Sequence, residues 1–519
     1  MEADEGEEEQ DGFTDLIAGT DEEVSLSLRP QEDQKEILQE IQDLEALVPQ
    51  LTANYRIVDR LGSGTFSSVY KAVDLNYDKY YNAPWHGNHP AASSAYYQSV
   101  THPPRTKVFV AVKRIYVTSS AERIRNEIAI MEECRGCRHI SQLITAFRQA
   151  DQVVVLMPYH RNEDFRDLYH TLPIAAVKMY FRCLFRALRD IHARGIIHRD
   201  VKPANFLFDP RTGIGTLCDF GLASRMTELF AHGTCLHTGA TSKKPNGEIK
   251  NYERDWLNAK QRDARTRSVG APDKVGYPQN DTRPHAKANR AGTRGFRAPE
   301  VLLKCGQQTG AIDIWAAGMI LLFFLTQKFP LMNSSDDVEA LVEIATIIGR
   351  RKMEKAAALH NRLFVSNVPS ITLDGMSWTE FVKKQNENLY EPPDPDIRYY
   401  PYYTPEIDHA LSLVEALLEP RSVMRLTAAE ALRHPFLREP SAPGSSKPFV
   451  DDDEFFPHPP GQGKCGKYHS RDTVTEEWYA KVWVEGAHGG GRWVMKNVSA
   501  GECLAIGNMP CQLHRNVKL

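Results

Sequence analysis

The order in which two hydrophobic patterns occur along this 519-residue chain limits the folds open to it. Strand-like patterns come first, at 55–72, 108–115 and 152–157. Helical spacing of apolar residues follows at 174–194, 298–348 and 406–437. Because the strands precede the helices rather than alternating with them, the chain is predicted to adopt an α+β fold whose first part is rich in β-structure.

The composition, with 42% hydrophobic and 25% charged side chains, is that of a folded protein. The longest uncharged apolar run, Ile314–Leu325, has 12 residues, well short of the ~20 that span a bilayer. The start of the chain has neither the basic residues nor the apolar stretch of a secretory signal. We therefore expect no membrane segment, an intracellular location and reduced thiols for the nine cysteines.

Charge and apolar spacing divide the N-terminal part of the chain. Residues 1–48 carry 17 acidic and two basic side chains, so the rest of the chain is net positive, which suits an acidic partner or substrate. Residues 1–30 contain too few apolar groups to offset chain entropy and are predicted to be disordered. Residues 31–50 show helical spacing and predict an amphipathic docking helix that packs on the next part of the chain.

Three stretches are predicted to be loop insertions, at 73–107, 222–291 and about 385–405. The second lies in a basic stretch, 222–294, with 14 Lys/Arg against 7 Asp/Glu. Few aromatic residues are interleaved with these charges, so direct binding to nucleic acid is not favoured. A partner-docking or nuclear-targeting insertion fits better.

Two glycines and a lysine suggest a phosphate-binding site. Gly62 and Gly64, in a strand-turn-strand setting, allow backbone N–H groups to approach an anionic phosphate. This pattern alone is weak, because a glycine pair in a hairpin is usually only a turn. Lys113 ends a buried strand and therefore needs anionic partners, and Glu127 on the next helix is a natural one.

Two further motifs contain the groups that transfer of a phosphoryl group requires. His198-Arg-Asp-Val-Lys-Pro-Ala-Asn205 follows the long helix, and Asp219-Phe-Gly221 follows a short strand. Asp200 can accept or orient the proton of an attacking hydroxyl, and Lys202 can neutralise charge on the transferred group. Asn205 and Asp219 can hold Mg²⁺. Each motif alone could be a solvated loop or a turn, but their joint occurrence in this order indicates phosphoryl transfer.

With Ala298-Pro-Glu300 and Asp313-Ile-Trp315 added, the set resembles the eukaryotic protein kinase family over residues 55–437. The resemblance implies a bilobal fold, with a β-rich N-lobe and a helical C-lobe in a kinase domain at 51–438 and a C-terminal tail at 439–519. It implies a structural bridge between Glu300 and Arg425. The spacing of Lys202 from Asp200 is similar to that of the serine/threonine branch.

The same resemblance implies ATP and Mg²⁺ as cofactors and a hinge at Met157–His160, with Met157 as gatekeeper. Ser67 stands where the family usually has a third loop glycine. The implied ATP-binding residues are Leu61, Gly62, Ser63, Gly64, Thr65, Val69, Ala111, Lys113, Met157 and Tyr159. The implied catalytic residues are Lys113, Glu127, Asp200 and Lys202, and the implied metal ligands are Asn205 and Asp219.

A closer resemblance lies in segments 62–72, 153–165, 198–208 and 291–305. They are similar to the catalytic subunit of the Dbf-four-dependent kinase (DDK, the cell-division-cycle-seven type), as found in fungi. This implies activation by a Dbf-four-type regulatory subunit, MCM helicase subunits as substrates, and a role in initiating DNA replication in the nucleus. It also implies a preference for Ser/Thr followed by an acidic or phosphorylated residue.

The substrate-binding residues implied by this resemblance are Thr293, Arg294 and Arg297. Either arginine can pair with a carboxylate or phosphate just after the target hydroxyl. Alternatively, both hold the activation segment internally. Thr293 is expected to support Asp200 and Lys202.

Two other functions remain open. A pseudokinase-like scaffold would present the insertions to partners without transferring phosphate, although scaffolds usually lack one of the catalytic groups that this chain retains. An acidophilic Ser/Thr kinase of another subfamily would keep the chemistry and would be active as an isolated chain.

Cysteine and histidine spacing raises the question of metal binding in two places. Cys134-x-x-Cys137 could be half a zinc site or a redox pair, but ordinary thiols are expected there. The tail offers Cys465 and His469, then Cys511 and His514, with Cys503 as a spare. A structural Zn²⁺ in the tail is one interpretation, and a metal-free aromatic appendage is the other.

Overall fold

The structure is a computed structural model that describes residues 25–80, 82, 107–135, 137–226, 235–241, 243–250, 255, 258–259, 262, 274–276, 291–392, 403–438, 469–471, 478–485 and 491–498. The chain divides into two compact units. Among the described residues, unit 1 contains 25–80, 82, 107–128 and 142–159, and unit 2 contains 129–141 and those from 160 onwards. The boundary between Tyr159 and His160 falls in the predicted hinge.

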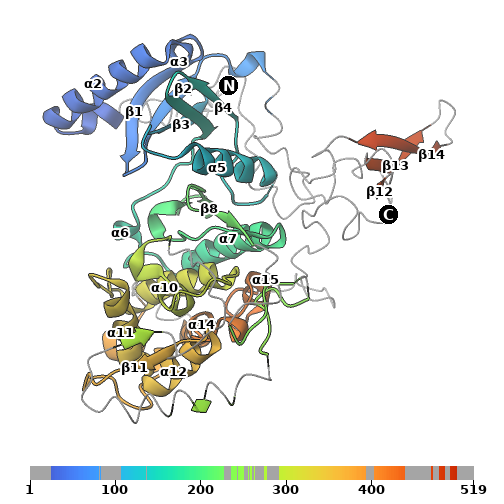
Figure 1. The fold of residues 1–519 in the computed structure, drawn as a ribbon. Helices are drawn as coiled ribbons and strands as arrows, with labels where there is room; N and C mark the ends of the chain where they lie inside the picture. The colour runs from blue at the N-terminus through green and yellow to red at the C-terminus, as the bar shows by residue number, and fades with distance from the viewer. Residues whose placement is uncertain are drawn as a thin grey trace, which may run out of the picture. The chain divides into compact units, whose positions relative to one another are not determined.

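Unit 1 is built on an antiparallel sheet (Figure 1). The sheet has five strands in the order β1-β2-β3-β5-β4. Its strands are β1 (Tyr55–Ser63), β2 (Ser67–Asp74), β3 (Phe109–Ile115), β4 (Thr145–Gln149) and β5 (Gln152–Pro158). The strands are rich in Val, Ile and other residues that fit a pleated surface. Helix α5 (Ala121–Glu133), which follows β3, begins in unit 1.

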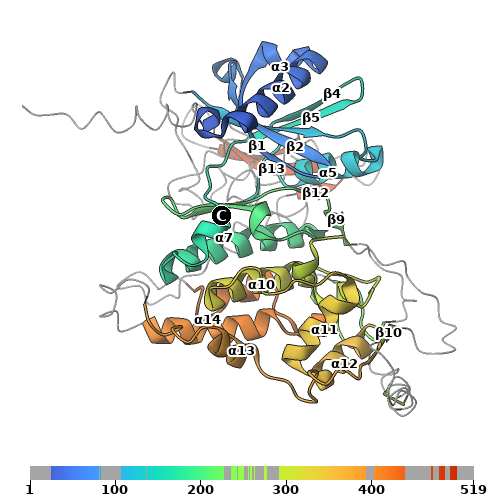
Figure 2. The ribbon, with the colours of Figure 1, turned by 90° about the vertical axis from the view of Figure 1, so that its left-hand side faces the viewer.

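Two helices, α2 (Gln31–Leu47) and α3 (Pro49–Asn54), lie on one side of this sheet (Figure 2). The fully or almost fully buried residues Ile37, Ile41 and Leu44 of α2 share one hydrophobic core with Tyr70 and Val112 of the sheet. Ahead of α2, residues Ser25–Leu28 form a 3-10 turn. The helix spacing at 31–50 therefore corresponds to two helices whose apolar sides are buried against the sheet.

Unit 2 is mainly helical. Its helices are α6 (Phe165–Leu168), α7 (Ile174–Ala193), α9 (Pro299–Leu302), α10 (Ala311–Thr326), α11 (Asp337–Ile348), α12 (Arg350–Leu359), α13 (Trp378–Gln385), α14 (Tyr403–Leu417) and α15 (Ala428–Arg433). Its short strands are β6 (Ile196–Ile197), β7 (Phe206–Asp209), β8 (Ile214–Leu217), β9 (Ser224–Arg225), β10 (Lys274–Gly276) and β11 (Leu363–Val365). Further 3-10 turns are η2 (Tyr77–Lys79) in unit 1 and η4 (Pro203–Asn205), η6 (Arg294–Phe296) and η8 (Ser422–Met424) in unit 2.

Helix α10 is the centre of unit 2. Every residue of its sequence AIDIWAAGMILLFFLT is buried, and it contacts α7, α13 and α14. An apolar helix of this kind must be enclosed by other helices. The helix ends at Thr326, because the next residue, Gln327, has a φ of 53° that is incompatible with a further helical turn. None of the described helices is long and apolar enough to cross a membrane.

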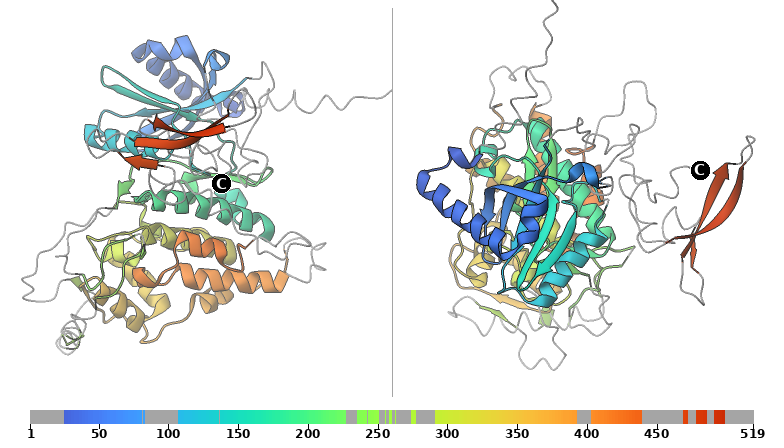
Figure 3. Two further views of the ribbon diagram at one scale, coloured as in Figure 1. Left: turned by 90° about the vertical axis from the view of Figure 1, so that its right-hand side faces the viewer. Right: turned by 90° about the horizontal axis from the view of Figure 1, so that it is seen from above.

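The tail contains a three-stranded antiparallel sheet, drawn in red in Figure 3, of β12 (His469–Arg471), β13 (Trp478–Glu485) and β14 (Gly491–Val498). The register pairs Trp483 with Trp493. The sequence shows no strong period in the tail, and these strands were not predicted. The predicted α+β fold is confirmed by the sheet of unit 1 and the helices of unit 2.

Candidate active site

The predicted ATP-binding residues all lie in unit 1, on β1, β2, β3 and β5, in the turn after β1, or directly after β5. The strand register pairs Gly62 with Val69, Val69 with Lys113, and Ala111 with Met157. Side chains alternate along a strand, and cross-strand partners share a face. Val69, Ala111, Lys113 and Met157 therefore lie on the face opposite to the one that α2 covers.

The glycine-containing turn at the end of β1 is open to solvent. Residues 61–66 are all exposed, and the Gly64 N–H donates to the Ser67 carbonyl over 2.9 Å, which closes the turn. An exposed turn with small side chains lets a phosphate approach the backbone closely.

Lys113 and Glu127 form the ion pair predicted from their spacing. The Lys113 Nζ lies 2.5 Å from Glu127 Oε1, and both side chains are buried. A buried ammonium without a partner would be strongly disfavoured, so Glu127 fixes the position of the lysine. Lys71, on the same face, was not predicted to matter, yet its Nζ lies 4.5 Å from the Phe109 ring centroid and 4.3 Å from that of Tyr159.

In unit 2, the buried carboxylate of Asp313 holds the backbone at the start of residues 198–205, here called the catalytic loop. Oδ2 accepts a hydrogen bond from the His198 backbone N–H and Oδ1 accepts one from the Arg199 backbone N–H, each over 2.8 Å. Oδ2 also lies 2.9 Å from His192 Nε2. Burial raises the pKa of Asp313, but the hydrogen bond and charge of His192, with His198, outweigh it and leave the pKa below its usual value. The sequence motif contains Asp313 but does not indicate this role.

The Asp313→Asn variant should lose about 2 kcal/mol of stability. The asparagine side chain has one acceptor oxygen in place of two, and its NH₂ group would face a backbone N–H. Its kcat should fall as well, since the loop that positions Asp200 loosens. Thermal unfolding and a kinase assay measure the two effects. Asp408→Asn is the control, because this exposed carboxylate accepts a bond from Tyr390 and none from another side chain in the described part of the chain. An Asp313→Asn protein with the control's Tm would contradict the anchor role.

Asp200 lies at the centre of a hydrogen-bond network. Its Oδ1 accepts the N–H of Thr293 over 2.9 Å and the Thr293 hydroxyl over 2.7 Å. Its Oδ2 accepts Asn205 Nδ2 over 3.0 Å and lies 2.8 Å from Lys202 Nζ. Lys202 Nζ also donates to Thr293 Oγ1 over 3.0 Å. The four predicted residues Asp200, Lys202, Asn205 and Thr293 are therefore brought together, and the carboxylate is held in one orientation.

The predicted metal ligands supply oxygen atoms of the kind that Mg²⁺ prefers. Asn205 uses its amide nitrogen for Asp200, including a bond to the Asp200 carbonyl over 2.9 Å, and this keeps its amide oxygen for a cation. Asp219 has a φ of 63°, and its Oδ1 accepts the Gly221 N–H over 3.3 Å. The next side chain, Phe220, is fully buried and packs edge-on against the His198 ring, which fixes this turn. The donor set of this site therefore fits Mg²⁺.

The segment that presents Thr293 depends on Gly292. A Cβ at this position would lie 2.4 Å from the Arg199 carbonyl oxygen, and its φ of 110° strongly disfavours any other residue. The Gly292 carbonyl accepts Arg297 Nε over 2.9 Å, and Arg297 Nη1 lies 2.6 Å from Asp337 Oδ1. Arg297 is thus engaged within the protein. The Arg294 side chain is 42% exposed and donates to the Ser334 carbonyl over 3.0 Å.

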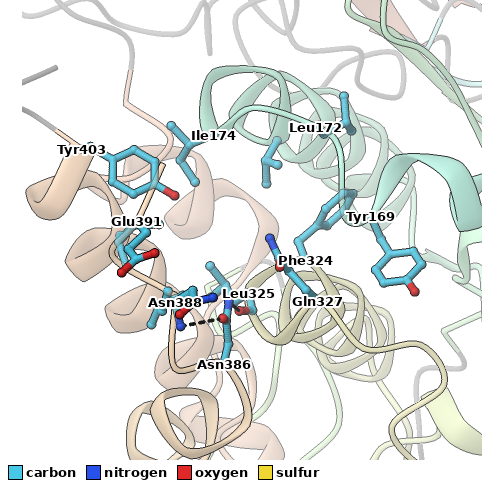
Figure 4. Close-up of a pocket in the computed structure, with 13 residues that line it drawn as sticks. Tyr169, Leu172, Ile174, Phe324, Leu325, Gln327, Asn386, Asn388, Glu391 and Tyr403 are labelled. Atoms are coloured by element: carbon cyan, nitrogen blue, oxygen red, sulfur yellow. Dashed lines mark hydrogen bonds between the residues drawn. The ribbon is translucent and has the colours of Figure 1, made fainter. Parts of the chain in front are cut away.

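A separate pocket of about 480 Å³, counting its open mouth, lies between the ends of α7, α10 and α14 in unit 2 (Figure 4). Its lining is apolar and aromatic, with the amides of Gln327, Asn386 and Asn388 and the carboxylate of Glu391. Asn386 Nδ2 donates to the Leu325 carbonyl over 2.9 Å. No basic side chain lines it, so it lacks the chemistry of a phosphate site.

The two candidate metal motifs differ in what the structure describes. Cys134 and Cys137 are both buried and unbridged. A hydrogen bond with Cys137 is the main cause that raises the pKa of the Cys134 thiol, and burial raises it further. This favours an unreactive thiol. In the tail, Cys465, Cys503, Cys511 and His514 lie outside the described residues, and only the backbone of His469 is described, within β12.

Comparisons with known proteins agree with this geometry. The protein kinase domain family matches residues 95–238 and 276–437. The chain is similar to the cell cycle serine/threonine-protein kinase hsk1 of Schizosaccharomyces pombe, at 41% identity over 77% of this chain and 75% of hsk1. It is 36% identical to the cell cycle protein kinase spo4 of the same yeast, over 76% of this chain and 88% of spo4. A probable cell division control protein 7 homolog of Encephalitozoon cuniculi is 34% identical over 78% of this chain and 97% of its own length.

The chain belongs to the protein kinase family. It is a serine/threonine kinase with the bilobal kinase fold, as predicted. Within the family its similarity is to kinases of the cell division control protein 7 type, and the predicted resemblance is thereby confirmed. Use of ATP and Mg²⁺ follows from the family.

Proposed function

We propose that this chain is the catalytic subunit of a nuclear kinase that phosphorylates MCM helicase subunits when DNA replication begins. A Dbf-four-type regulatory subunit activates it, and its targets are Ser/Thr residues in acidic contexts. The observation that carries the catalytic part is the bonding of Asp200 to Lys202, Asn205 and Thr293. The cell-cycle kinases among its relatives support the biological role.

The residues of the chain have distinct tasks in the reaction. When bound, ATP supplies the phosphoryl group and Mg²⁺ neutralises its charge. Asn205 and Asp219 would hold the metal, and Lys113, fixed by Glu127, would contact the phosphates. Asp200 orients the hydroxyl of the substrate and receives its proton, while the ammonium of Lys202 offsets negative charge next to it.

The arginines near Thr293 support the proposed preference for acidic substrates. Arg294, which is half-exposed, can pair with a carboxylate or phosphate that follows the target residue. Arg297 is bonded to Asp337 and Gly292, which favours a role in holding the segment that substrates meet. Of the three predicted substrate-binding residues, Arg294 is proposed to contact the acidic group of the substrate, whereas Thr293 and Arg297 support the segment around it.

The Arg294→Ala variant should lower kcat/KM about 10-fold more for a peptide with Glu after the target Ser than for the matched Ala peptide. The reason is that the neutral peptide has no charge for the guanidinium to pair with. Arg297→Ala should lower both values together, because it loosens the segment. Steady-state kinetics on the two peptides measure this, with the exposed Arg211→Ala as control. Equal losses for Arg294→Ala on both peptides would make Arg294 structural.

The regulatory part of the proposal is tested by phosphorylation of an MCM N-terminal tail. The purified chain is assayed with Mg²⁺ and ATP, alone and with a Dbf-four-type subunit, using Asp200→Asn as the blank. Activity that requires the subunit supports the proposal. Strong activity of the chain alone would instead indicate another acidophilic kinase. Absence of activity in a complex shown to assemble would favour the scaffold alternative.

Two finer proposals concern location and the tail. The clusters Lys243-Lys244 and Arg262–Arg267 support nuclear targeting, and replacing them with alanines in a fluorescently tagged chain should move it out of the nucleus. The tail residues Cys465, His469, Cys511 and His514 are proposed to hold a structural Zn²⁺. Metal analysis of a Cys465→Ser/Cys511→Ser chain tests that assignment.

A further inference from the structure

Two cysteines and two histidines meet inside unit 2. Cys235 and His237 lie in the basic insertion, Cys305 lies after α9, and His360 directly follows α12. Their side chains are 5%, 1%, 0% and 0% exposed, in chain order. One potential ligand atom from each residue lies within 4.8 Å of all the others. Neither the fold nor the kinase chemistry described above uses this cluster.

Three of the separations between these atoms match the edges of a tetrahedral zinc site. With Zn–S near 2.3 Å and Zn–N near 2.05 Å, a tetrahedron has S···S, S···N and N···N edges of about 3.8, 3.6 and 3.3 Å. The Cys235 and Cys305 sulfur atoms are 3.7 Å apart. Cys305 Sγ lies 3.4 Å from His237 Nε2, and that nitrogen lies 3.1 Å from His360 Nδ1. Each kind of edge is therefore represented to within about 0.2 Å.

We propose that Cys235, His237, Cys305 and His360 bind a structural Zn²⁺. Neighbouring groups already orient the ligand atoms. His237 Nδ1 contacts the Thr238 carbonyl over 2.9 Å, so that this nitrogen carries the proton and Nε2 presents its lone pair to the cluster. The Gln307 N–H donates to Cys305 Sγ over 3.3 Å, as backbone amides do to a thiolate ligand.

Charge and polarity favour a metal over a cluster joined only by hydrogen bonds. Two thiols that bind Zn²⁺ release two protons to solvent, and the resulting site of two thiolates, two neutral imidazoles and one dication is uncharged, as burial requires.

A disulfide between the two cysteines is the main alternative. It would require the sulfur atoms to approach from 3.7 Å to about 2.05 Å. It would also leave both imidazoles buried without a reason to converge. Four ligands that converge within 4.8 Å, with three of their separations near tetrahedral edges, fit a closed structural zinc site better.

The site would fasten part of the long insertion to the helical unit. In the described part of 235–250, Leu236 N–H donates to the Leu359 carbonyl over 2.9 Å, and Asn246 Nδ2 donates to the Arg425 carbonyl over 2.7 Å. The ligands come from three separate stretches of sequence, so the metal cross-links the insertion to the ends of α9 and α12. A stretch rich in polar residues can then be ordered without a hydrophobic core of its own.

Metal content and coordination of the full-length chain test the assignment directly. Purified under reducing conditions, the chain should contain about one tightly held zinc, or about two if the tail binds one as well. Zinc-edge X-ray absorption on the Cys465→Ser/Cys511→Ser chain isolates the site in unit 2 and should show two sulfur and two nitrogen neighbours. A metal-free chain that also fails to bind added Zn²⁺ would overturn the proposal, as would a first shell without sulfur.

Variants provide the second test. Cys305→Ser should lose the zinc of unit 2, whereas Cys183→Ser, which alters another buried thiol of the same unit, should retain it. Because Cys305→Ser could disturb folding, wild type is also treated with a zinc chelator, and tryptic cleavage after Lys243 and Lys250 is followed. Removing the metal should speed this cleavage at least about 10-fold, since the segment is then released. An unchanged rate after complete metal loss would refute the fastening role, and neither readout depends on kinase activity.

Discussion

Replacing Asp200 with asparagine should lower kcat by about 10³-fold and leave the fold unchanged. An asparagine has the same size and can still accept a bond from Thr293 at its amide oxygen, so the packing around the site is kept. It cannot receive the proton of the substrate hydroxyl, and its NH₂ would face the Lys202 ammonium rather than attract it. Single-turnover kinetics with Mg²⁺ and ATP would measure the loss, and circular dichroism would check the fold.

The control for this variant is Asp374→Asn, since Asp374 is exposed and pairs with the exposed Arg351 over 2.7 Å. Its activity should equal that of wild type. If Asp200→Asn retained more than about a tenth of wild-type activity, the carboxylate would only position Thr293, and general-base catalysis would have to come from another group. A Thr293→Ala variant separates these roles, because it removes the hydroxyl and keeps the carboxylate.

Replacing Arg425 with methionine should destabilise the chain by about 3–5 kcal/mol, the usual result of removing one partner from a buried ion pair. Arg425 donates to both carboxylate oxygens of Glu300, over 2.6 and 3.0 Å, and to the carbonyls of Ala311 and Glu419. Both charged side chains are buried. Differential scanning calorimetry should show a fall in Tm of roughly 10 °C.

The pH dependence of this effect follows from the pKa of Glu300. Burial raises that pKa, but the charge and hydrogen bonds of Arg425 outweigh burial and leave it below the ordinary value of 4.5. The contribution of the pair to stability is therefore complete above pH 4.5 and is lost as the pH falls through the lower pKa of the folded state. The free energies of unfolding of wild type and Arg425→Met, measured by chemical denaturation, should accordingly converge as the pH is lowered below the pKa of Glu300 in the folded protein.

A double variant, Glu300→Gln with Arg425→Met, tests the physical reason for the loss. Removing both charges should destabilise the protein less than removing Arg425 alone, because no unpaired charge then remains buried. If Arg425→Met were more stable than the double variant, the loss of stability in Arg425→Met would come from lost packing rather than from the unpaired Glu300 carboxylate.

The sequence was sufficient to predict those parts of the site whose residues lie close together in the chain. Asp200, Lys202 and Asn205 belong to one loop, so their spacing alone indicates a shared site. Lys113 and Glu127 lie 14 residues apart on a strand and the helix that follows it, and the structure pairs them. The α+β fold followed from the change in hydrophobic period, because strand and helix each impose their own spacing on buried residues.

Contacts between distant segments were not predictable in this way. The Asp337 carboxylate that engages Arg297 lies 40 residues further along the chain, and no local spacing marks it. Cys235 and His360 are 125 residues apart, so their cluster resembles no short zinc motif, and the sequence directed attention to the cysteines of the tail instead. The burial of Lys71 against Phe109 and Tyr159 likewise depends on strand register, which composition does not reveal.

Helix α2 bears on where the independently folding part of this protein begins. Its side chains Ile37, Ile41 and Leu44 complete the core of the five-stranded sheet, although they lie ahead of the first residue that the kinase family matches. A recombinant fragment cut at β1 would leave Tyr70 and Val112 facing water, with an apolar surface prone to self-association. An expression fragment intended for crystallography or inhibitor screening should therefore begin no later than residue 25, where the 3-10 turn ahead of α2 starts.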